Sequence, residues 1–172
     1  MKHLYLPSPF ELSTKGKTLR HWKLTASSSG LKRLQLLEEA GEDSPELYDF
    51  MREAREQLQA YFAGRLKNFD LPLDWSEATD FYRAVWTELM NIPYGHTASY
   101  LEIARRIGKP KAVRAVGQAN RRNPLPIIVP CHRVIATSGE LHGFYYGLDM
   151  KRQLLALENP KSYGEQTRLE FT

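Results

Sequence analysis

The sequence predicts an α+β protein of two domains: a small N-terminal α/β domain, then a mainly helical C-terminal domain that contains a helix-turn-helix. Three observations lead to this prediction. Strand-like runs precede one long amphipathic helical pattern, a proline-containing break follows near residue 70, and only short helical patterns lie beyond it. With 172 residues, the chain can bury one good core or two small ones.

The N-terminal domain is expected to combine a β-hairpin with one helix. Apolar runs at residues 19–24 and 31–37 flank the turn-forming residues 27–30. Ser44-Pro45 then supplies an N-cap and a first-turn proline, and apolar residues recur at helical spacing from there to Gly64. This pattern predicts an amphipathic helix packed on a small sheet.

A break in the helical pattern separates the predicted domains. Residues 71–76 include a proline and are predicted to be a linker between an N-terminal domain of residues 1–70 and a C-terminal domain of residues 77–158. The polar residues 159–172 that follow are predicted to form a weakly ordered tail.

The C-terminal domain is predicted to begin and end with a helix. The first helix starts near Ser76 and stops before residues 92–95, where a proline and a glycine force a turn. The apolar residues 127–129 are expected to form a buried strand that leads to Cys131. A final amphipathic helix is predicted over residues 149–158.

Two short helices joined by a glycine-containing turn are predicted in the middle of this domain. The first opens at Ser99, whose spacing to Glu102 matches a capping box, and stops at Gly108, after which the second spans residues 109–119. This outline fits a helix-turn-helix, and an ordinary αα-hairpin has the same spacing. Small residues on the second helix permit close approach to DNA, and basic residues could neutralise phosphates, although a solvated basic face has the same composition. These residues are Lys111, Ala112, Arg114, Ala115, Gly117 and Arg121.

The only cysteine of the chain, Cys131, lies within residues 130–134, which read Pro-Cys-His-Arg-Val. Nearby imidazole, guanidinium or backbone amide groups can lower the pKa of a thiol enough to make it a nucleophile near neutral pH. A lone cysteine is also often a small buried hydrophobe, and adjacency in sequence does not place His132 beside the sulfur. The pentapeptide alone leaves both interpretations open.

Composition excludes several classes of protein. One cysteine cannot form an intrachain disulfide or a zinc site that needs two thiolates from one chain. No apolar stretch approaches the roughly 20 residues that span a bilayer, and the N-terminus lacks the features of a signal peptide. We therefore expect a cytoplasmic protein without a membrane partner. The formal net charge of +4 is mild evidence for a polyanionic partner.

Five motifs, taken in order, resemble those of the O6-alkylguanine-DNA alkyltransferases, also called methylated-DNA-protein-cysteine methyltransferases. They lie at residues 92–95, 99–100, 110–117, 123–126 and 130–134. The resemblance implies a ribonuclease-H-like N-terminal domain and a monomer that acts on duplex DNA. It also implies a single, irreversible transfer of an alkyl group such as methyl from guanine O6 to the cysteine. No cofactor is implied, and no metal is expected because the zinc-binding cysteines of some relatives are missing.

The resemblance implies roles for individual residues. Cys131 would accept the alkyl group, His132 would pair with its thiol through water, and Glu158 would orient the imidazole. Tyr100 would contact the base as O6 leaves, and Asn123 would form a hinge between the DNA-binding motif and the active-site segment. The alkyl pocket would involve Pro126, Val134, Phe144, Tyr145 and Tyr146.

The resemblance also implies how DNA is bound. A thiol cannot reach an atom of a stacked base, so the nucleotide must rotate out of the duplex, and Arg114 would fill the space that it leaves. The second helix of the helix-turn-helix would dock in the minor groove, where small side chains allow close approach. His142 is atypical at its position and has no predicted role beyond an exposed turn.

Two alternatives remain at this point. Alkyltransferase-like proteins bind alkylated guanine without repairing it, but they characteristically lack the acceptor cysteine. A hydrolase could also be built from Cys131, His132 and Glu158, although the sequence indicates neither an oxyanion hole nor an acyl pocket.

Overall fold

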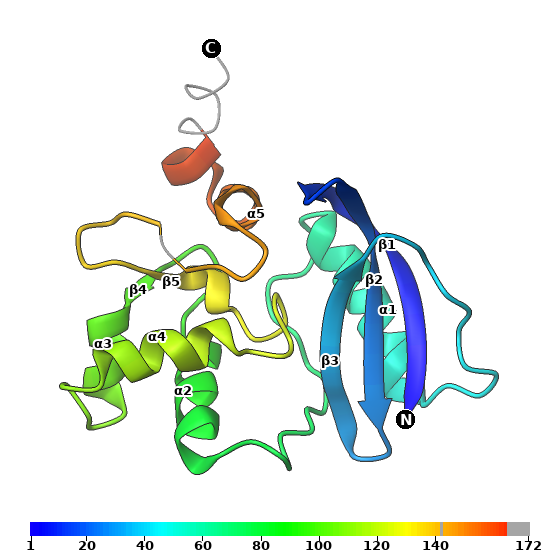
Figure 1. The fold of residues 1–172 in the computed structure, drawn as a ribbon, viewed down its shortest axis with the longest axis horizontal. Helices are drawn as coiled ribbons and strands as arrows, with labels where there is room; N and C mark the ends of the chain where they lie inside the picture. The colour runs from blue at the N-terminus through cyan, green and yellow to red at the C-terminus, as the bar shows by residue number, and fades with distance from the viewer. Residues whose placement is uncertain (142, 165–172) are drawn as a thin grey trace. The chain divides into compact units, whose positions relative to one another are not determined.

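The computed structural model describes residues 1–141 and 143–164, and it divides the chain into two compact units, Met1–Ser76 and Glu77–Thr172 (Figure 1). The interpretation of His142 and most of the predicted tail fall outside the described residues. None of the helices in the described ranges has the length and hydropathy needed to span a bilayer.

The N-terminal unit is a three-stranded antiparallel sheet with one helix against it (Figure 1). Its elements are β1 (Lys2–Thr14), β2 (Lys17–Ser27), β3 (Gly30–Leu37) and α1 (Asp49–Phe62). The predicted hairpin is present as β2 and β3, whereas β1 was not predicted. This strand contains Pro7 and Pro9, which weaken its sequence signal, but an edge strand tolerates prolines, and the register shifts between Pro7 and Leu12.

The predicted start of α1 is wrong. Ser44 does not cap this helix, because its hydroxyl accepts a hydrogen bond from the His3 amide at 2.8 Å and its own amide donates to the His3 carbonyl at 2.9 Å. The helix begins at Asp49 instead, with Tyr48 as its N-cap residue. A tertiary partner on β1 thus takes the groups that the local sequence pattern assigned to capping.

The segment expected to be a linker is hydrogen-bonded to β3 in its first part. The amide of Leu31 donates to the carbonyl of Pro72 at 2.8 Å, and the amide of Asp74 donates to the carbonyl of Leu31 at 2.8 Å. This approach is so close that a Cβ at Gly30 would lie 2.8 Å from the Pro72 oxygen. Glycine at this turn therefore lets the segment join the sheet.

The C-terminal unit is mainly helical, with one very short parallel strand pair. Its first elements are α2 (Asp80–Met90), β4 (Ala98–Ser99), α3 (Tyr100–Arg106) and α4 (Val113–Arg121). They are followed by the 3₁₀ turn η1 (Cys131–Arg133), β5 (Val134–Ile135), α5 (Leu148–Glu158) and the π-helical turn η2 (Pro160–Gly164). The helices α2, α3 and α4 pack on one another, and η1 packs on α2 and α5.

Helix starts in this unit follow their capping groups. The capping box predicted at Ser99 is confirmed, because both reciprocal hydrogen bonds between Ser99 and Glu102 are present. The predicted start of α2 is wrong, since the Thr79 side chain accepts from the Tyr82 amide and α2 begins at Asp80. The helix predicted over residues 109–119 also begins later than expected, as α4 at Val113. The Ala112 amide donates to the Lys109 carbonyl in a separate turn before it.

The predicted buried strand at residues 127–129 does not form. Ile127 has a φ of +75°, and the Ile128 and Val129 amides bond back to residues 126 and 125, so the chain turns tightly. Asn123 supports this turn, since its side-chain amide donates to the Val129 carbonyl at 2.8 Å. The apolar run was a correct signal of burial, but a short run does not specify a strand.

Candidate active site

The lone cysteine lies where the tight turn meets η1, which packs on α2 and α5. Only 4% of Cys131 is exposed. The strands β4 and β5 pair in parallel, with Ala98 opposite Val134, which brings the start of α3 close to the segment that carries the thiol. The pairing of these two short strands, which are far apart in the sequence, thus brings the parts of the site together.

Burial dominates the chemistry of the thiol. It raises the pKa of Cys131 to about 11, although a hydrogen bond from Asn123 and the charge of Lys151 act in the opposite direction. At neutral pH the group is therefore a thiol, and the neighbouring groups do not lower its pKa below the usual value. Any nucleophilic reaction at this sulfur requires a base that removes its proton.

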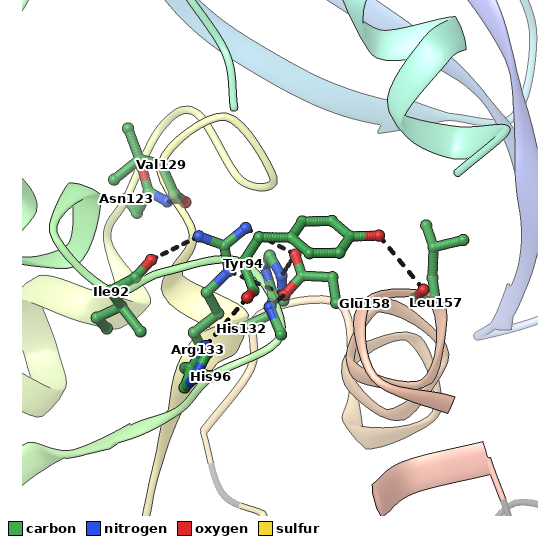
Figure 2. Close-up of polar contacts among 10 residues, drawn as sticks. Ile92, Tyr94, His96, Asn123, Val129, His132, Arg133, Leu157 and Glu158 are labelled. Atoms are coloured by element: carbon green, nitrogen blue, oxygen red, sulfur yellow. Dashed lines mark hydrogen bonds and ion pairs between the residues drawn. The ribbon is translucent and has the colours of Figure 1, made fainter. Parts of the chain in front are cut away.

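The residue that follows Cys131 forms a buried pair with a glutamate on α5 (Figure 2). Nε2 of His132 lies 2.8 Å from Oε1 of Glu158. Burial would raise the pKa of Glu158, but the hydrogen bonds and charges of His132 and Arg133 outweigh it and hold the pKa well below its usual range. The group is a carboxylate, which only accepts hydrogen bonds, so Nε2 of His132 carries the donated proton.

The imidazole of His132 is neutral at neutral pH. Burial lowers its pKa, the Glu158 carboxylate opposes this effect, and the cations Arg133 and Lys151 reinforce it. With the proton on Nε2, Nδ1 carries the lone pair. Nδ1 is buried, and no group of the described residues forms a hydrogen bond with it. This nitrogen is therefore available to accept a proton.

Arg133 forms an ion pair with the same glutamate. Arg133, 5% exposed, donates from Nε to Oε2 of Glu158 at 2.9 Å and from Nη2 to Oε1 at 2.8 Å. Its Nη1 donates to the carbonyl of Ile92 at 2.7 Å, and the ring of Tyr94 lies 5.8 Å from the guanidinium carbon (Figure 2). Arg133 thus fixes the carboxylate in a bidentate geometry.

A lysine on α5, Lys151, is fully buried and contacts the chain segment that follows Cys131. The ammonium group of Lys151 donates to the carbonyl of Val134 and is electrostatically coupled to the Cys131 sulfur. Burial lowers the pKa of Lys151 to about 8, and the charge of Cys131 opposes this shift. At pH 7 most of these lysines are therefore charged.

Two asparagines, one on α4 and one just after it, form hydrogen bonds with the chain segment that leads to Cys131. The Asn123 side chain donates to the Val129 carbonyl and accepts from the Leu125 amide, and it also forms a hydrogen bond with Cys131 that lowers the pKa of the thiol. Asn120, on the buried face of α4, donates from Nδ2 to the Cys131 carbonyl at 3.3 Å. The predicted hinge residue is thus part of the thiol environment.

The predicted pocket residues fall into buried and exposed groups. Pro126, Val134 and Phe144 are buried, Tyr146 is intermediate, and Tyr145 is 73% exposed. Tyr145 and Tyr146 form an edge-to-face pair with centroids 4.9 Å apart. The loop reaches the start of α3, since a Cβ at Gly143 would lie 3.3 Å from the Tyr100 hydroxyl.

The hydroxyl of Tyr100 is close enough to the thiol for their charges to interact. Burial raises the pKa of Tyr100, the charge of Cys131 raises it further, and Arg121 opposes both. The phenol therefore keeps its proton at neutral pH and can donate a hydrogen bond. The predicted residues Tyr100, Asn123, Cys131, His132 and Glu158 thus belong to one connected region.

The predicted DNA-contacting residues lie around α4. Lys111, Arg114, Ala115 and Arg121 are exposed, while Ala112 and Gly117 are intermediate. The buried side of the helix consists of Val116, Ala119 and Asn120, so its exposed side combines small and basic residues. Such a surface can approach a phosphate backbone closely.

Sequence reasoning missed two buried polar residues of this region, Asn120 and Lys151, and it missed the contact between Arg133 and Glu158. Helical spacing could have indicated the two residues. Asn120 lies four positions after the buried Val116, and Lys151 lies seven positions before Glu158 on the same face of α5. No pattern in the sequence indicates that Arg133 binds the glutamate rather than solvent.

A metal centre finds no support in the described part of the chain, where no group of three or more His, Cys, Asp or Glu side chains could hold an ion.

Comparison with known proteins identifies similar chains across both units. Residues 80–160 match the family model described as 6-O-methylguanine DNA methyltransferase, DNA binding domain, and residues 23–75 match the one described as 6-O-methylguanine DNA methyltransferase, ribonuclease-like domain. The methylated-DNA-protein-cysteine methyltransferase of Methanosarcina barkeri is 52% identical over 140 residues, which cover 78% of this chain and 88% of the relative.

A relative of the same name from Mycobacterium tuberculosis is 48% identical over 149 residues, which cover 84% of this chain and 89% of that one. Among solved structures, the Mycobacterium tuberculosis OGT in complex with DNA has a TM-score of 0.77 and 43% sequence identity. The match covers 92% of each chain.

Proposed function

The chain belongs to the methylated-DNA-protein-cysteine methyltransferase family, and from that premise we propose how its own residues carry out DNA repair by alkyl transfer. The protein is a methyltransferase that acts on DNA and takes the alkyl group onto its cysteine, Cys131. One observation carries the residue-level proposal: the buried, protonated thiol is followed in the chain by a neutral histidine whose imidazole is bound to a buried carboxylate.

The reaction begins with loss of the thiol proton. His132 accepts the proton of Cys131 at Nδ1, through one water molecule, while Nε2 remains bonded to Glu158. The S–H bond breaks, the sulfur keeps the electron pair, and the imidazole becomes a cation. Glu158 stabilises that cation, as the third member of a nucleophile, base and orienter set does in general.

The thiolate then displaces guanine from the alkyl carbon. A C–S bond forms as the bond between carbon and O6 breaks, and the guanine leaves as an anion whose charge is spread over O6 and N1. The Tyr100 hydroxyl, which keeps its proton at neutral pH, supports the departing base by hydrogen bonding. The proton held by the imidazole finally neutralises the guanine, and the thioether on Cys131 has no easy leaving group.

The base must leave the duplex to reach this buried sulfur, at a cost of a few kcal/mol. We place α4 in the minor groove, with the exposed Arg114 filling the vacated stack and with Lys111 and Arg121 near phosphates. The small residues Ala115 and Gly117 allow the helix to come close to the DNA. A monomeric state and a cytoplasmic location remain predictions of the sequence.

A titration with excess substrate tests this function. Duplex DNA that contains one O6-methylguanine is added in large molar excess, and repaired DNA is measured until the reaction stops. We expect the repaired DNA to reach a plateau equal to the molar amount of protein, and a Cys131→Ala variant to repair none. Repair that continues past one equivalent contradicts the proposal, and lesion binding without repair supports the sensor alternative.

A further inference from the structure

The carboxylate of Glu158 receives hydrogen bonds from two segments of the C-terminal unit, η1 and the turn at residues 92–95 (Figure 2). Oε1 accepts from His132 Nε2 and Arg133 Nη2, each at 2.8 Å. Oε2 accepts from Arg133 Nε at 2.9 Å and, more weakly, from the Gly95 amide at 3.4 Å. Only an ionised carboxylate can accept all four, so Glu158 remains an anion and cannot take a proton from His132.

Arg133 is itself held by the turn at residues 92–95. Its third hydrogen bond goes to the Ile92 carbonyl at 2.7 Å, and the ring of Tyr94 lies within cation-π distance. The same turn is tied to the end of α5, because Asn159 Nδ2 donates to the Gly95 carbonyl at 3.0 Å. Residues 92–95 therefore contact both the guanidinium of Arg133 and the carboxylate of Glu158 and help to fix their positions.

The charge state of His132 depends on this arrangement. The charged groups that act on it are Glu158 and Lys151 on α5 and Arg133 on η1, while the Cys131 thiol is uncharged at rest. Glu158 favours the imidazolium, whereas burial and the two cations favour the neutral ring. Without Arg133, His132 would be the only ionisable partner of the carboxylate, which would draw a proton onto the ring. An imidazolium cannot accept the proton of Cys131.

We propose that Arg133 is a positioning residue for alkyl transfer. It shares the carboxylate of Glu158 with His132, so that the imidazole stays neutral at rest, with its proton on Nε2 and its lone pair on Nδ1. This inference rests on the proposed function and deepens it, because it states what makes His132 a base. Proton transfer then converts a neutral imidazole and a thiol into an imidazolium and a thiolate, with Glu158 ionised throughout.

A pH profile separates this role from a purely structural one. A residue that only supports the fold would slow the reaction by the same factor at every pH. Loss of Arg133 should instead raise the pKa of His132, so that the ring is protonated, and inactive as a base, up to a higher pH. The acid side of the rate profile should therefore move toward alkaline pH.

The experiment measures the single-turnover rate of methyl transfer to the full chain, from duplex DNA containing one O6-methylguanine, between about pH 5 and about pH 9. In Arg133→Met, we expect the acid limb to move up by about one pH unit or more, and the rate at acid pH to fall about tenfold or more. Arg133→Lys keeps the charge and should retain a limb near the wild-type position. Arg152→Met, on α5, is the matched control and should leave the profile unchanged.

An unmoved acid limb in Arg133→Met, with or without a uniform loss of rate, overturns the proposal. A second measurement covers the case in which this variant does not fold. Nitrogen NMR of the wild-type protein, with ¹⁵N-labelled histidine, should show His132 as the neutral tautomer protonated at Nε2 at pH 7, and an imidazolium there overturns the proposal. If the wild-type protein forms no thioether at any pH, the proposed function fails, while the NMR result still decides the state of His132.

Discussion

At the scale of single residues, burial and charge act in opposite directions on the reacting sulfur. Burial raises the pKa of Cys131 to about 11, while Asn123 and Lys151 favour the thiolate. A buried thiol that is protonated at rest is protected from unwanted oxidation and metal binding, because the thiolate is the reactive form. The same burial makes the thiolate, once formed, a poorly solvated nucleophile, and in the proposed mechanism His132 generates it.

Replacement of Lys151 by methionine should raise the pKa of Cys131 further and slow alkyl transfer. The variant keeps an unbranched side chain of nearly the same length but removes the cation coupled to the sulfur. Because burial lowers the pKa of Lys151, its charge costs folding free energy at neutral pH, and we expect the variant to fold. Loss of one such cation should reduce the rate about tenfold, corresponding to about one pKa unit.

Ultraviolet absorbance of the thiolate against pH gives the pKa of Cys131, and intact mass against time gives the rate of transfer. Lys161→Met is the matched control, because this lysine is exposed on η2 and should affect neither quantity. A Lys151→Met protein with an unchanged thiol pKa and an unchanged rate would show that this ammonium group does not assist the sulfur.

The sequence identified the reacting cysteine and its histidine by motif, but it could not determine their charge states. Adjacent residues in a chain do not reveal which side chains are desolvated, and the His132 partner lies 26 residues away on α5. The resemblance supplied Glu158, and the structure shows that this residue contacts His132. Arg133 could not be assigned from sequence, because its bonds to Glu158 and Ile92 join three separate segments.

At the scale of elements, local capping signals were reliable where no tertiary partner competed. Ser99 and Glu102 form the predicted capping box because both groups lie within one turn of α3. Ser44 fails as a cap because His3 of β1 takes its hydroxyl and its amide. The short apolar run at residues 127–129 forms a turn rather than a strand, and the Asn123 side-chain amide supports that turn by donating to the Val129 carbonyl.

Gly117 on α4 provides a prediction at this scale. A Cβ at this position would lie 3.8 Å from Cδ1 of Tyr100, an ordinary contact, so the protein itself has room for alanine. Gly117→Ala should therefore raise the free energy of unfolding by about 0.5 to 1 kcal/mol. The extra methyl lies beside Tyr100 on a partly exposed part of α4, the helix that we place against DNA, so we expect weaker binding to duplex DNA.

Urea unfolding and fluorescence titration with labelled duplex DNA measure these two effects. Gly108→Ala is the control: Gly108 has a φ of +74°, so the same substitution should destabilise the protein by about 1 to 2 kcal/mol. A Gly117→Ala protein that gains stability and also binds DNA more tightly would contradict the placement of this face of α4 on DNA.

At the scale of the whole molecule, the reaction chemistry is confined to one of the two units. Every residue of the candidate active site lies within Glu77–Thr172, where the short β4 and β5 pair, η1 and α5 bring distant segments together. The order of the motifs along the chain was enough to indicate the family. The convergence of residues 92–95 and 130–134 on the end of α5 required the structure, because it depends on tertiary packing.

The most direct test of the central claim is the mass of the intact protein, with peptide mapping, after mixing it with an equimolar amount of duplex DNA that contains one O6-methylguanine. Methyl transfer predicts a protein heavier by one methyl group, with the modification on Cys131 and a matching loss of the lesion from the DNA. A protein of unchanged mass, or a methyl group on any other residue, would contradict alkyl transfer to Cys131.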